Sequence, residues 1–553
     1  MSKLLMLIFI SFSVQANELS INKKEKFESY QEIKKNNEKQ YFKMLKELQK
    51  VLILKDEGSK SQVLNFLSKL NVKIVATGST FIIIRPLENI DKNDFNKILD
   101  KIKNRDEIKS ITSDSIVRKK EESDDITKVC NKDNQKQVSD LLKPLFQITQ
   151  EASQSKCYMA PHCNDNINPS WARMQIGADL AEKVVAKTLK DNENELLATV
   201  AVIDSGFDFK NQSNAIDANS IVIEKGHESS GNPNIDPDGH GTAVSGMVSG
   251  NGIGITKNIN LRVYRVTEKY ATGSTSSAML AASIEKACEK SDIVNVSWGS
   301  AFDELGMSKI ENALWYKKAK ERGCLVVKSA GNSGVKNAKK QEIPIDAPFI
   351  SVAASDQFSE EATFSTKGMI SAPGAGVYSL LSHHHEYSNS TIKNGCRLNG
   401  AAVGPINGTS FSSPILAGVA GQVLTILKSN KAMPADPVKK VSLLKSILLA
   451  SVKWNRETGS KNNSVNALLA TLIATKMTNN NYTLELDKLT DLGKQAAANK
   501  SEEQVNDCDN EILCENKRTC SDSLRYKIFA CVPLSEQVFK YAISSFNSMN
   551  EIE

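Results

Sequence analysis

The sequence contains no long apolar run after its N-terminus. The apolar stretch from Leu4 to Val14 follows a lysine at position 3 and ends in Val14-Gln15-Ala16, a small-residue pattern that suits signal peptidase. The stretch is too short for a mature membrane helix, which needs about 20 residues. We therefore predict a signal peptide over residues 1–16, a secreted or periplasmic protein, and no membrane partner once the signal is removed.

The sequence also lacks any block of one charge. Its net charge of +6 is spread over many lysines, and charged residues make up 24% of the chain. This modest basic balance predicts no nucleic-acid partner. A chain of 553 residues is too long for one simple domain and suggests about three.

The cysteines near the C-terminus lack the histidine partners and the paired C-x-x-C spacing of a zinc site. They lie close together in an expected cysteine-rich module at 504–553, where an oxidising compartment would let them form two disulfides. These four cysteines are Cys508, Cys514, Cys520 and Cys531.

The other six cysteines are less informative. Cys288 is expected at the end of a helix and Cys324 at the start of a strand, so we expect two buried thiols, with a mutual disulfide as the alternative. Sequence alone assigns no partner to Cys130, Cys157, Cys163 and Cys396. The adjacent His383, His384 and His385 cannot all face one ion and have no acidic cluster beside them, so we expect an exposed loop and assign no metal site.

The most informative stretch runs from Asn407 to Ala417 and reads NGTSFSSPILA. It places Ser410 at a loop-to-helix junction, where the hydroxyl is exposed and the backbone N–H has no helical acceptor. A serine there is most often only a helix cap. A nucleophilic serine also needs a base and an acid that orients the base.

Both partners occur upstream. The segment 198–209 reads ATVAVIDSGFDF, a β-branched strand that leads into Asp204. The segment 238–247 reads DGHGTAVSGM, which places His240 just before a helix of small residues. The motif G-x-S-x-G, which marks the nucleophile of α/β-hydrolases, is absent, and so is that family's order of Ser, Asp and His.

Three segments resemble the signatures of the subtilisin-like serine proteases, in that family's order of Asp, His and Ser: Asp204-Ser205-Gly206, His240-Gly241-Thr242 and Gly408-Thr409-Ser410. The resemblance implies that Ser410 is the nucleophile, His240 the general base, and Asp204 the group that orients the imidazole. Asn332 resembles the family's oxyanion asparagine, although an ordinary Asn-Ser-Gly turn is the alternative.

The same resemblance implies a substrate-binding segment and a first specificity pocket. Ser297, Trp298 and Gly299 resemble the strand that binds substrate, and Ala330 and Gly331 would floor the pocket. No cofactor is required. Family members often bind structural calcium, and the carboxylates that could serve are those of Asp208, Asp236 and Asp238.

Apolar and polar patterns predict two folded units. The first, at 51–118, has a β-α-β-β-α-β order with strands at 51–54, 72–76, 81–85 and 108–117 and helices at 61–70 and 92–103. It follows a helical N-terminal segment at 17–50 and precedes a linker at 119–168. By pattern alone it is a small α+β module; before a subtilisin-like unit it resembles the family's inhibitory propeptide, with the maturation cut in the linker.

The second unit is expected at 169–475 and alternates apolar strands with amphipathic helices, which predicts a mostly parallel sheet covered on both faces. Strands are expected at 199–203, 261–266, 292–297, 325–329 and 349–353, and helices at 241–250, 276–289, 309–322 and 438–454, with a closing helix at 463–470. A linker at 476–503 follows. We predict a secreted serine endopeptidase made as a zymogen, with protein or peptide substrates; the alternative is a catalytically inactive subtilisin-like binding protein.

Overall fold

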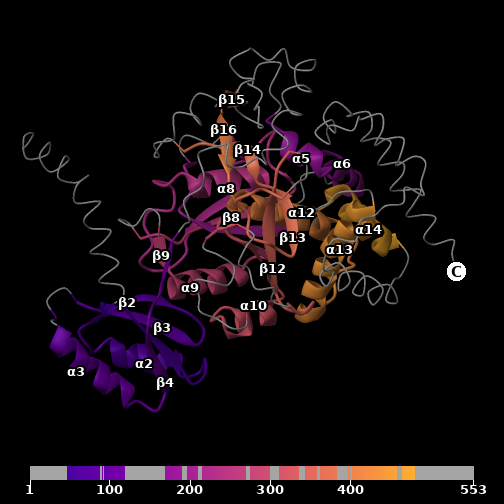
Figure 1. The fold of residues 1–553 in the computed structure, drawn as a ribbon. Coiled ribbons are helices and arrows are strands. Elements are labelled where there is room, and N and C mark those ends of the chain that lie inside the picture. Colours follow the sequence, from indigo (N-terminus) through magenta and orange to yellow (C-terminus); the bar gives the residue numbers. More distant parts are fainter. Residues whose placement is uncertain are drawn as a thin grey trace, which may run out of the picture.

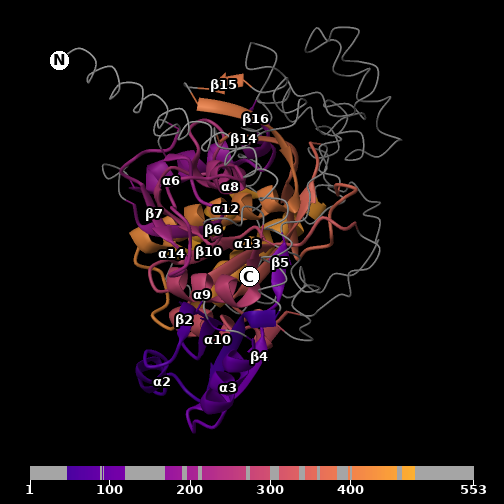
Figure 2. The ribbon, with the colours of Figure 1, turned by 90° about the vertical axis from the view of Figure 1, so that its left-hand side faces the viewer.

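The structure is a computed structural model that describes residues 47–118, 169–457 and 464–479. Shorter gaps within these ranges are 88–89, 91, 190–195, 210–214, 269–273, 299–309, 335–342, 358–360, 383–395 and 399–400. The expected signal peptide, most of the segment 17–50, the linker 119–168, His383 to His385 and the module 504–553 lie outside the described residues. Figures 1 and 2 show the two folded units from two sides.

The larger unit is built around a seven-stranded parallel sheet with the order β13-β12-β11-β10-β6-β8-β7. Its strands are β6 (Ala198–Asp204), β7 (Ile221–Lys225), β8 (Ile259–Arg265), β10 (Ile293–Val296), β11 (Leu325–Ser329), β12 (Phe349–Ser355) and β13 (Ile370–Pro373). This confirms the predicted parallel sheet.

Helices cover both faces of this sheet, as predicted, because alternate residues of the buried strands face opposite layers. In β6, Val200 and Val202 join one apolar core, whereas Ala201 and Ile203 join another. The first core is completed by α5 (Trp171–Gln175), α6 (Ala178–Leu189), α8 (His240–Ser249), α12 (Thr409–Ser429), α13 (Pro437–Glu457) and α14 (Ala467–Asn479). The second is completed by α9 (Ser277–Cys288) and α10 (Tyr316–Arg322) (Figure 1).

The central helix of the larger unit is α12. Among the described residues it is the one helix long and apolar enough to cross a membrane, and every residue from Thr409 to Leu427 is buried inside the protein. Burial on every side explains why its sequence is apolar all round. The helix thus carries Ser410 at its N-terminal end on a fixed core element.

Several elements differ from the predicted pattern. The helix expected over 309–322 is divided into a 3-10 turn, η4 (Ile310–Asn312), and α10, because the chain turns where Trp315 packs against Phe349, with ring centroids 6.2 Å apart. The sequence pattern also missed β7, β13 and a three-stranded sheet of β14 (Ala375–Leu380), β16 (Ala401–Asn407) and β15 (Cys396–Leu398). α14 begins at Ala467 and continues to Asn479.

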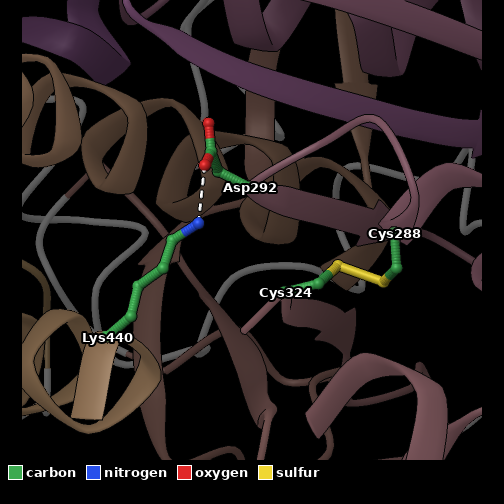
Figure 3. The surroundings of a disulfide bond; sticks show 4 residues. All are labelled: Cys288, Asp292, Cys324 and Lys440. Atoms are coloured by element: carbon green, nitrogen blue, oxygen red, sulfur yellow. Dashed lines mark hydrogen bonds and ion pairs between the residues drawn. A yellow bond between two sulfur atoms is a disulfide. The ribbon is translucent and has the colours of Figure 1, made fainter. Parts of the chain in front are cut away.

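Cys288 and Cys324 form a disulfide, so the expectation of two buried thiols was wrong (Figure 3). Both side chains are buried, as expected, but the end of α9 and the start of β11 bring their Cα atoms to 5.5 Å, within the range for a disulfide. The bond closes a loop of 36 residues and fixes α9 to the sheet.

Beside this disulfide, Asp292 joins four elements. Its carboxylate accepts hydrogen bonds from Lys440 of α13 (2.7 Å), Lys428 of α12 (2.6 Å) and the backbone N–H of Thr199 in β6 (2.9 Å) (Figure 3 draws the Lys440 pair). Although burial opposes ionisation, the two ammonium groups keep the pKa of Asp292 below its usual value. The start of β10 is therefore held against two helices.

The smaller unit has the predicted β-α-β-β-α-β order, and its antiparallel sheet has the order β2-β3-β1-β4, a ferredoxin-like arrangement. Its elements are β1 (Lys50–Leu54), α2 (Lys60–Leu67), β2 (Val72–Thr77), β3 (Phe81–Pro86), α3 (Lys92–Lys103) and β4 (Ile108–Ser113).

The prediction of a single strand over 108–117 was wrong. β4 ends at Ser113, and a separate strand, β5 (Ile116–Arg118), pairs with β9 (Ser274–Ser276) of the larger unit. The break lies at Asp114, whose buried carboxylate turns to the N-terminus of α9 and accepts from the backbone N–H of Ala278 at 3.2 Å.

Candidate active site

Asp204 is the last residue of β6, at the carboxyl edge of the parallel sheet. Its Oδ1 accepts hydrogen bonds from His240 Nδ1 (2.8 Å), the backbone N–H of Ser205 (2.8 Å) and Ser205 Oγ (3.2 Å). The Asp204 and His240 side chains are both completely buried. The carboxylate thus fixes the orientation of the imidazole, which begins α8.

Two glycines let the Asp204 and His240 segments approach so closely. Gly206 has φ +126°, and a Cβ there would lie 2.5 Å from the carbonyl oxygen of Ile235. A Cβ on Gly241 would collide with the carbonyl oxygen of Gly206. The glycine that follows Asp204-Ser205 and the one that follows His240 are therefore required by the contact between the two segments.

Asp236 holds the turn that leads into α8, a role that sequence reasoning missed. Its Oδ1 accepts from Ser205 Oγ (2.7 Å) and the backbone N–H of Gly239 (2.9 Å), and its Oδ2 accepts from the backbone N–H and the hydroxyl of Thr242 (both 2.7 Å). Burial, and then the nearby charge of Asp238, raise the pKa of the Asp236 carboxyl. Its position four residues before His240 was the available signal.

Arg265 of β8 supports the segment before this turn. Its guanidinium donates to the backbone carbonyl oxygens of Asn232 (2.8 Å) and Ile235 (2.9 Å). The side chain is buried, and this burial lowers the pKa of Arg265. Together with Asp236, the guanidinium fixes the backbone that presents His240.

Ser410 is the second residue of α12, and its carbonyl group is bonded in an unusual way. Pro414 stands four residues later inside the helix and has no N–H to donate to the Ser410 carbonyl. Ser297 Oγ donates to that oxygen instead, at 2.7 Å, and Ser410 Oγ donates to the carbonyl oxygen of Ser297 at 3.2 Å. Ser297 Oγ also contacts Asn295 Nδ2 (2.9 Å) and Ser413 Oγ (3.0 Å), so the nucleophile candidate and the segment after β10 are tied together.

Asn332 follows β11 and is oriented by the residue before Ser410. Its Oδ1 accepts from the backbone N–H of Thr409 (2.9 Å) and from Thr409 Oγ1 (2.7 Å), while Thr409 Oγ1 accepts from the backbone N–H of Gly331 (3.1 Å). Because Oδ1 faces Thr409, the Nδ2 group lies on the side of the amide away from that contact. The role of Thr409 is a second contribution that sequence reasoning missed.

Trp298 and Phe411 flank His240. The Trp298 ring lies edge-on to the imidazole with centroids 6.3 Å apart, and the Phe411 ring lies 5.4 Å from it. Because Phe411 follows Ser410, and Trp298 follows Ser297, the structure brings the predicted triad residues and the predicted substrate segment to one end of the sheet. Gly299 lies outside the described residues.

A family model described as the subtilase family matches residues 198–481, just over half of the chain. The chain belongs to the subtilase family. The matched region contains Asp204, His240, Asn332 and Ser410 in the order expected from the sequence.

Curated subtilases and a solved structure resemble the chain. Subtilisin-like protease 7 of Trichophyton equinum is 27% identical over 289 residues, 50% of this chain and 64% of that protein. Alkaline elastase YaB of a Bacillus strain is 34% identical over 201 residues, 35% of this chain and 47% of that protein. The chain therefore spans less than two thirds of each of these relatives. The crystal structure of an epidermin leader peptide processing serine protease from Staphylococcus aureus aligns with a TM-score of 0.48 and 17% identity, over 77% of this chain and 98% of that one.

The carboxylates of this subtilase that the sequence offered as calcium ligands have protein partners. The Asp236 carboxylate is surrounded by the donors given above, and Asp208 Oδ2 accepts a hydrogen bond from Ser382 Oγ at 3.4 Å. Within the part of the chain that the structure describes, no group of three or more His, Cys, Asp or Glu residues could hold a metal ion.

Proposed function

We propose that this subtilase is a serine endopeptidase, exported and made as a zymogen, which hydrolyses peptide bonds of proteins or peptides through an acyl-enzyme. The observation that carries the proposal is the buried 2.8 Å hydrogen bond between Asp204 and His240, at the end of the sheet where α12 presents Ser410. A nucleophile, a base and an oriented acid are what this chemistry needs.

In the proposed reaction, Ser410 Oγ attacks the scissile carbonyl carbon while His240 accepts its proton and later returns it to the leaving amine. Asp204 holds the imidazole in the required tautomer and stabilises its charged form. The tetrahedral oxyanion would accept from Asn332 Nδ2 and from the backbone N–H of Ser410, and one such side-chain donor is worth about 3–4 kcal/mol. Water then hydrolyses the acyl-enzyme by the same sequence of proton transfers.

A substrate would bind as an added strand. The backbone of Ser297, Trp298 and Gly299 would form one side of its site, and β9 the other. In the structure, β5 already pairs with β9 in antiparallel register, with Ile116 opposite Ser276 and Arg118 opposite Ser274. This pairing supports the proposal that the smaller unit is a propeptide whose last strand occupies a substrate position before the linker 119–168, where the maturation bond would fall.

Apolar burial between the two units supports the same proposal. The sheet of the smaller unit directs Leu52 and Ile82 toward its own helices, but Val51 and Ile83 join the core of the larger unit beside α9. In Figure 1 this sheet lies directly under α9. A sheet with two apolar faces is typical of a domain that is covered on both sides.

Charged contacts surround this apolar surface. Arg85 forms a two-pronged pair with Glu268, at 3.1 and 3.0 Å, and the Glu285 carboxylate accepts from the backbone N–H (2.5 Å) and hydroxyl (2.9 Å) of Ser79. Asp114 provides a negative charge at the N-terminus of α9, where the helix dipole favours it. The smaller unit would therefore block the cleft until the linker is cut.

The test is to produce the chain without residues 1–16 and follow its mass over time beside the Ser410→Ala variant, with a fluorophosphonate probe added to both. We expect cleavage within 119–168 and probe labelling in the wild-type protein, and neither in Ser410→Ala. Ser412→Ala is the matched control, because it removes a buried hydroxyl from the same helix turn and should leave both events intact.

If the wild-type precursor stays intact and unlabelled, it is treated with trypsin under mild conditions and probed again. Labelling after this step would indicate activation by another protease, and no labelling would indicate an inactive site. Normal processing of pure Ser410→Ala, or no labelling even after the trypsin step, contradicts the proposal.

A further inference from the structure

The strands β10 and β11 stop pairing beside the candidate active site. Their last paired residues are Val296 and Lys328. Beyond this point β11 stays with its other neighbour, since the backbone N–H of Ala330 donates to Val352 of β12 at 2.9 Å. A gap therefore opens between Ser297-Trp298 on one side and Ser329 to Gly331 on the other. The first of these segments belongs to the expected substrate-binding strand, and Ala330 and Gly331 to the expected floor of the first specificity pocket.

Lys328 extends across the base of this gap. Its Cα belongs to one wall, and its Nζ donates to the carbonyl oxygen of Trp298 on the other wall. Lys328 is only 5% exposed, so it lies below the surface and not over the opening. A side chain that begins on one wall and ends on the other fills the space between them at that depth.

The surroundings make a lysine at this position notable. β11 is buried along its whole length. Val326 is two residues before Lys328, on the same face of the strand, and belongs to the apolar core. Burying an ammonium group costs free energy unless its donors are satisfied, and the Trp298 carbonyl is one acceptor that satisfies it. The hydrogen bond also prevents the four-carbon stem from swinging away to admit a larger group.

We propose that Lys328 is a specificity-determining residue that forms the floor of the first specificity pocket together with Ala330 and Gly331, and that it restricts the pocket to short side chains. This inference rests on the proposed peptidase function. The pocket would accept a substrate with alanine or serine before the scissile bond and would reject leucine or phenylalanine, because their side chains would overlap the lysine stem.

The test uses the self-processed protein and one peptide series that differs only in the residue before the scissile bond, with alanine, serine, leucine and phenylalanine compared by kcat/KM. We expect alanine or serine to exceed phenylalanine at least tenfold in the wild-type protein, a range typical of pocket-size discrimination. Lys328→Ala should lower the alanine-to-phenylalanine ratio at least tenfold by opening the floor.

Val326→Ala is the matched control, because it shortens a buried side chain on the same face of β11, away from the gap. It should lower the melting temperature but leave the alanine-to-phenylalanine ratio unchanged. If Lys328→Ala does not fold, the wild-type series still decides: phenylalanine cleaved as well as alanine overturns the inference.

Fluorophosphonate labelling distinguishes this failure from failure of the peptidase function. A protein that labels at Ser410 but shows no preference for short side chains, or whose Lys328→Ala variant keeps the wild-type ratio, refutes the role of Lys328 alone. A protein that neither labels nor cleaves any peptide refutes the peptidase function and with it this inference.

Discussion

Replacing Ser297 by alanine should destabilise the fold through the carbonyl group of Ser410. This buried oxygen lacks the helical donor four residues later because Pro414 has no N–H, and the Ser297 hydroxyl takes that place at 2.7 Å. A buried acceptor that loses its donor costs about 1–3 kcal/mol. We therefore expect Ser297→Ala to lower the free energy of unfolding by about 2 kcal/mol.

The origin of this loss can be isolated with Pro414→Ala. An alanine in place of this proline restores a backbone N–H four residues after Ser410, where it can donate to the same carbonyl. The loss caused by Ser297→Ala should then be about 1 kcal/mol smaller in the Pro414→Ala background than in the chain that keeps Pro414. Asn295 and Ser413 also lose their contacts with the Ser297 hydroxyl, but they do so equally in both backgrounds. The double-mutant cycle therefore cancels the free energy of these two contacts.

The assay is urea unfolding, with every variant carrying Ser410→Ala to prevent self-cleavage while keeping the backbone carbonyl of that residue. Ser379→Ala is the control, because its hydroxyl donates to the carbonyl of Ala243 at 2.6 Å, away from Pro414. Its effect should be the same in both backgrounds. Equal losses from Ser297→Ala in the two backgrounds, within about 0.5 kcal/mol, would refute the reasoning.

Three further predictions address the supports of the site and of the core. Asp236→Asn places an N–H₂ group where the buried carboxylate accepted hydrogen bonds, so fluorophosphonate labelling should slow about 100-fold and the melting temperature should fall; unchanged labelling would contradict this. Burial lowers the pKa of Lys445 from 10.5 to about 7. Between these pH values Lys445 is protonated in the unfolded chain but not in the folded chain, so the free energy of unfolding rises with pH. Urea unfolding at pH 7 and 9 should show that rise, and Lys445→Met should reduce it. Replacing both Cys288 and Cys324 by alanine should cost about 4 kcal/mol from the 36-residue loop, and a reducing agent should destabilise the wild-type protein but not this variant.

Much of the fold could be predicted because it is encoded in short stretches. The apolar strands β6, β8, β10, β11 and β12 and both helices of the smaller unit were expected near their observed positions, since each has a clear period or a continuous apolar run. The strand β15 was missed because it is three residues long and contains an arginine, and β16 was missed because glycine and proline interrupt its pattern.

The contacts of the site are less accessible to sequence reasoning. The motifs led to Asp204 and His240, which do contact each other, but the hydrogen bonds of Asp236 and Thr409 exist only after the sheet has brought distant segments together. The Cys288–Cys324 bond was only the alternative prediction for the same reason, because the end of a helix and the start of a strand carry no sign in the sequence that they are neighbours.

The pairing of β5 with β9 has a consequence for solubility. Loss of the smaller unit would expose the backbone donors and acceptors of β9, and an open strand edge is a template for aggregation. This edge is only three residues long, Ser274–Ser276, and consists of hydroxyl-bearing side chains. It is long enough to pair with an extended peptide but offers too little backbone for two copies of the chain to join into a continuous sheet.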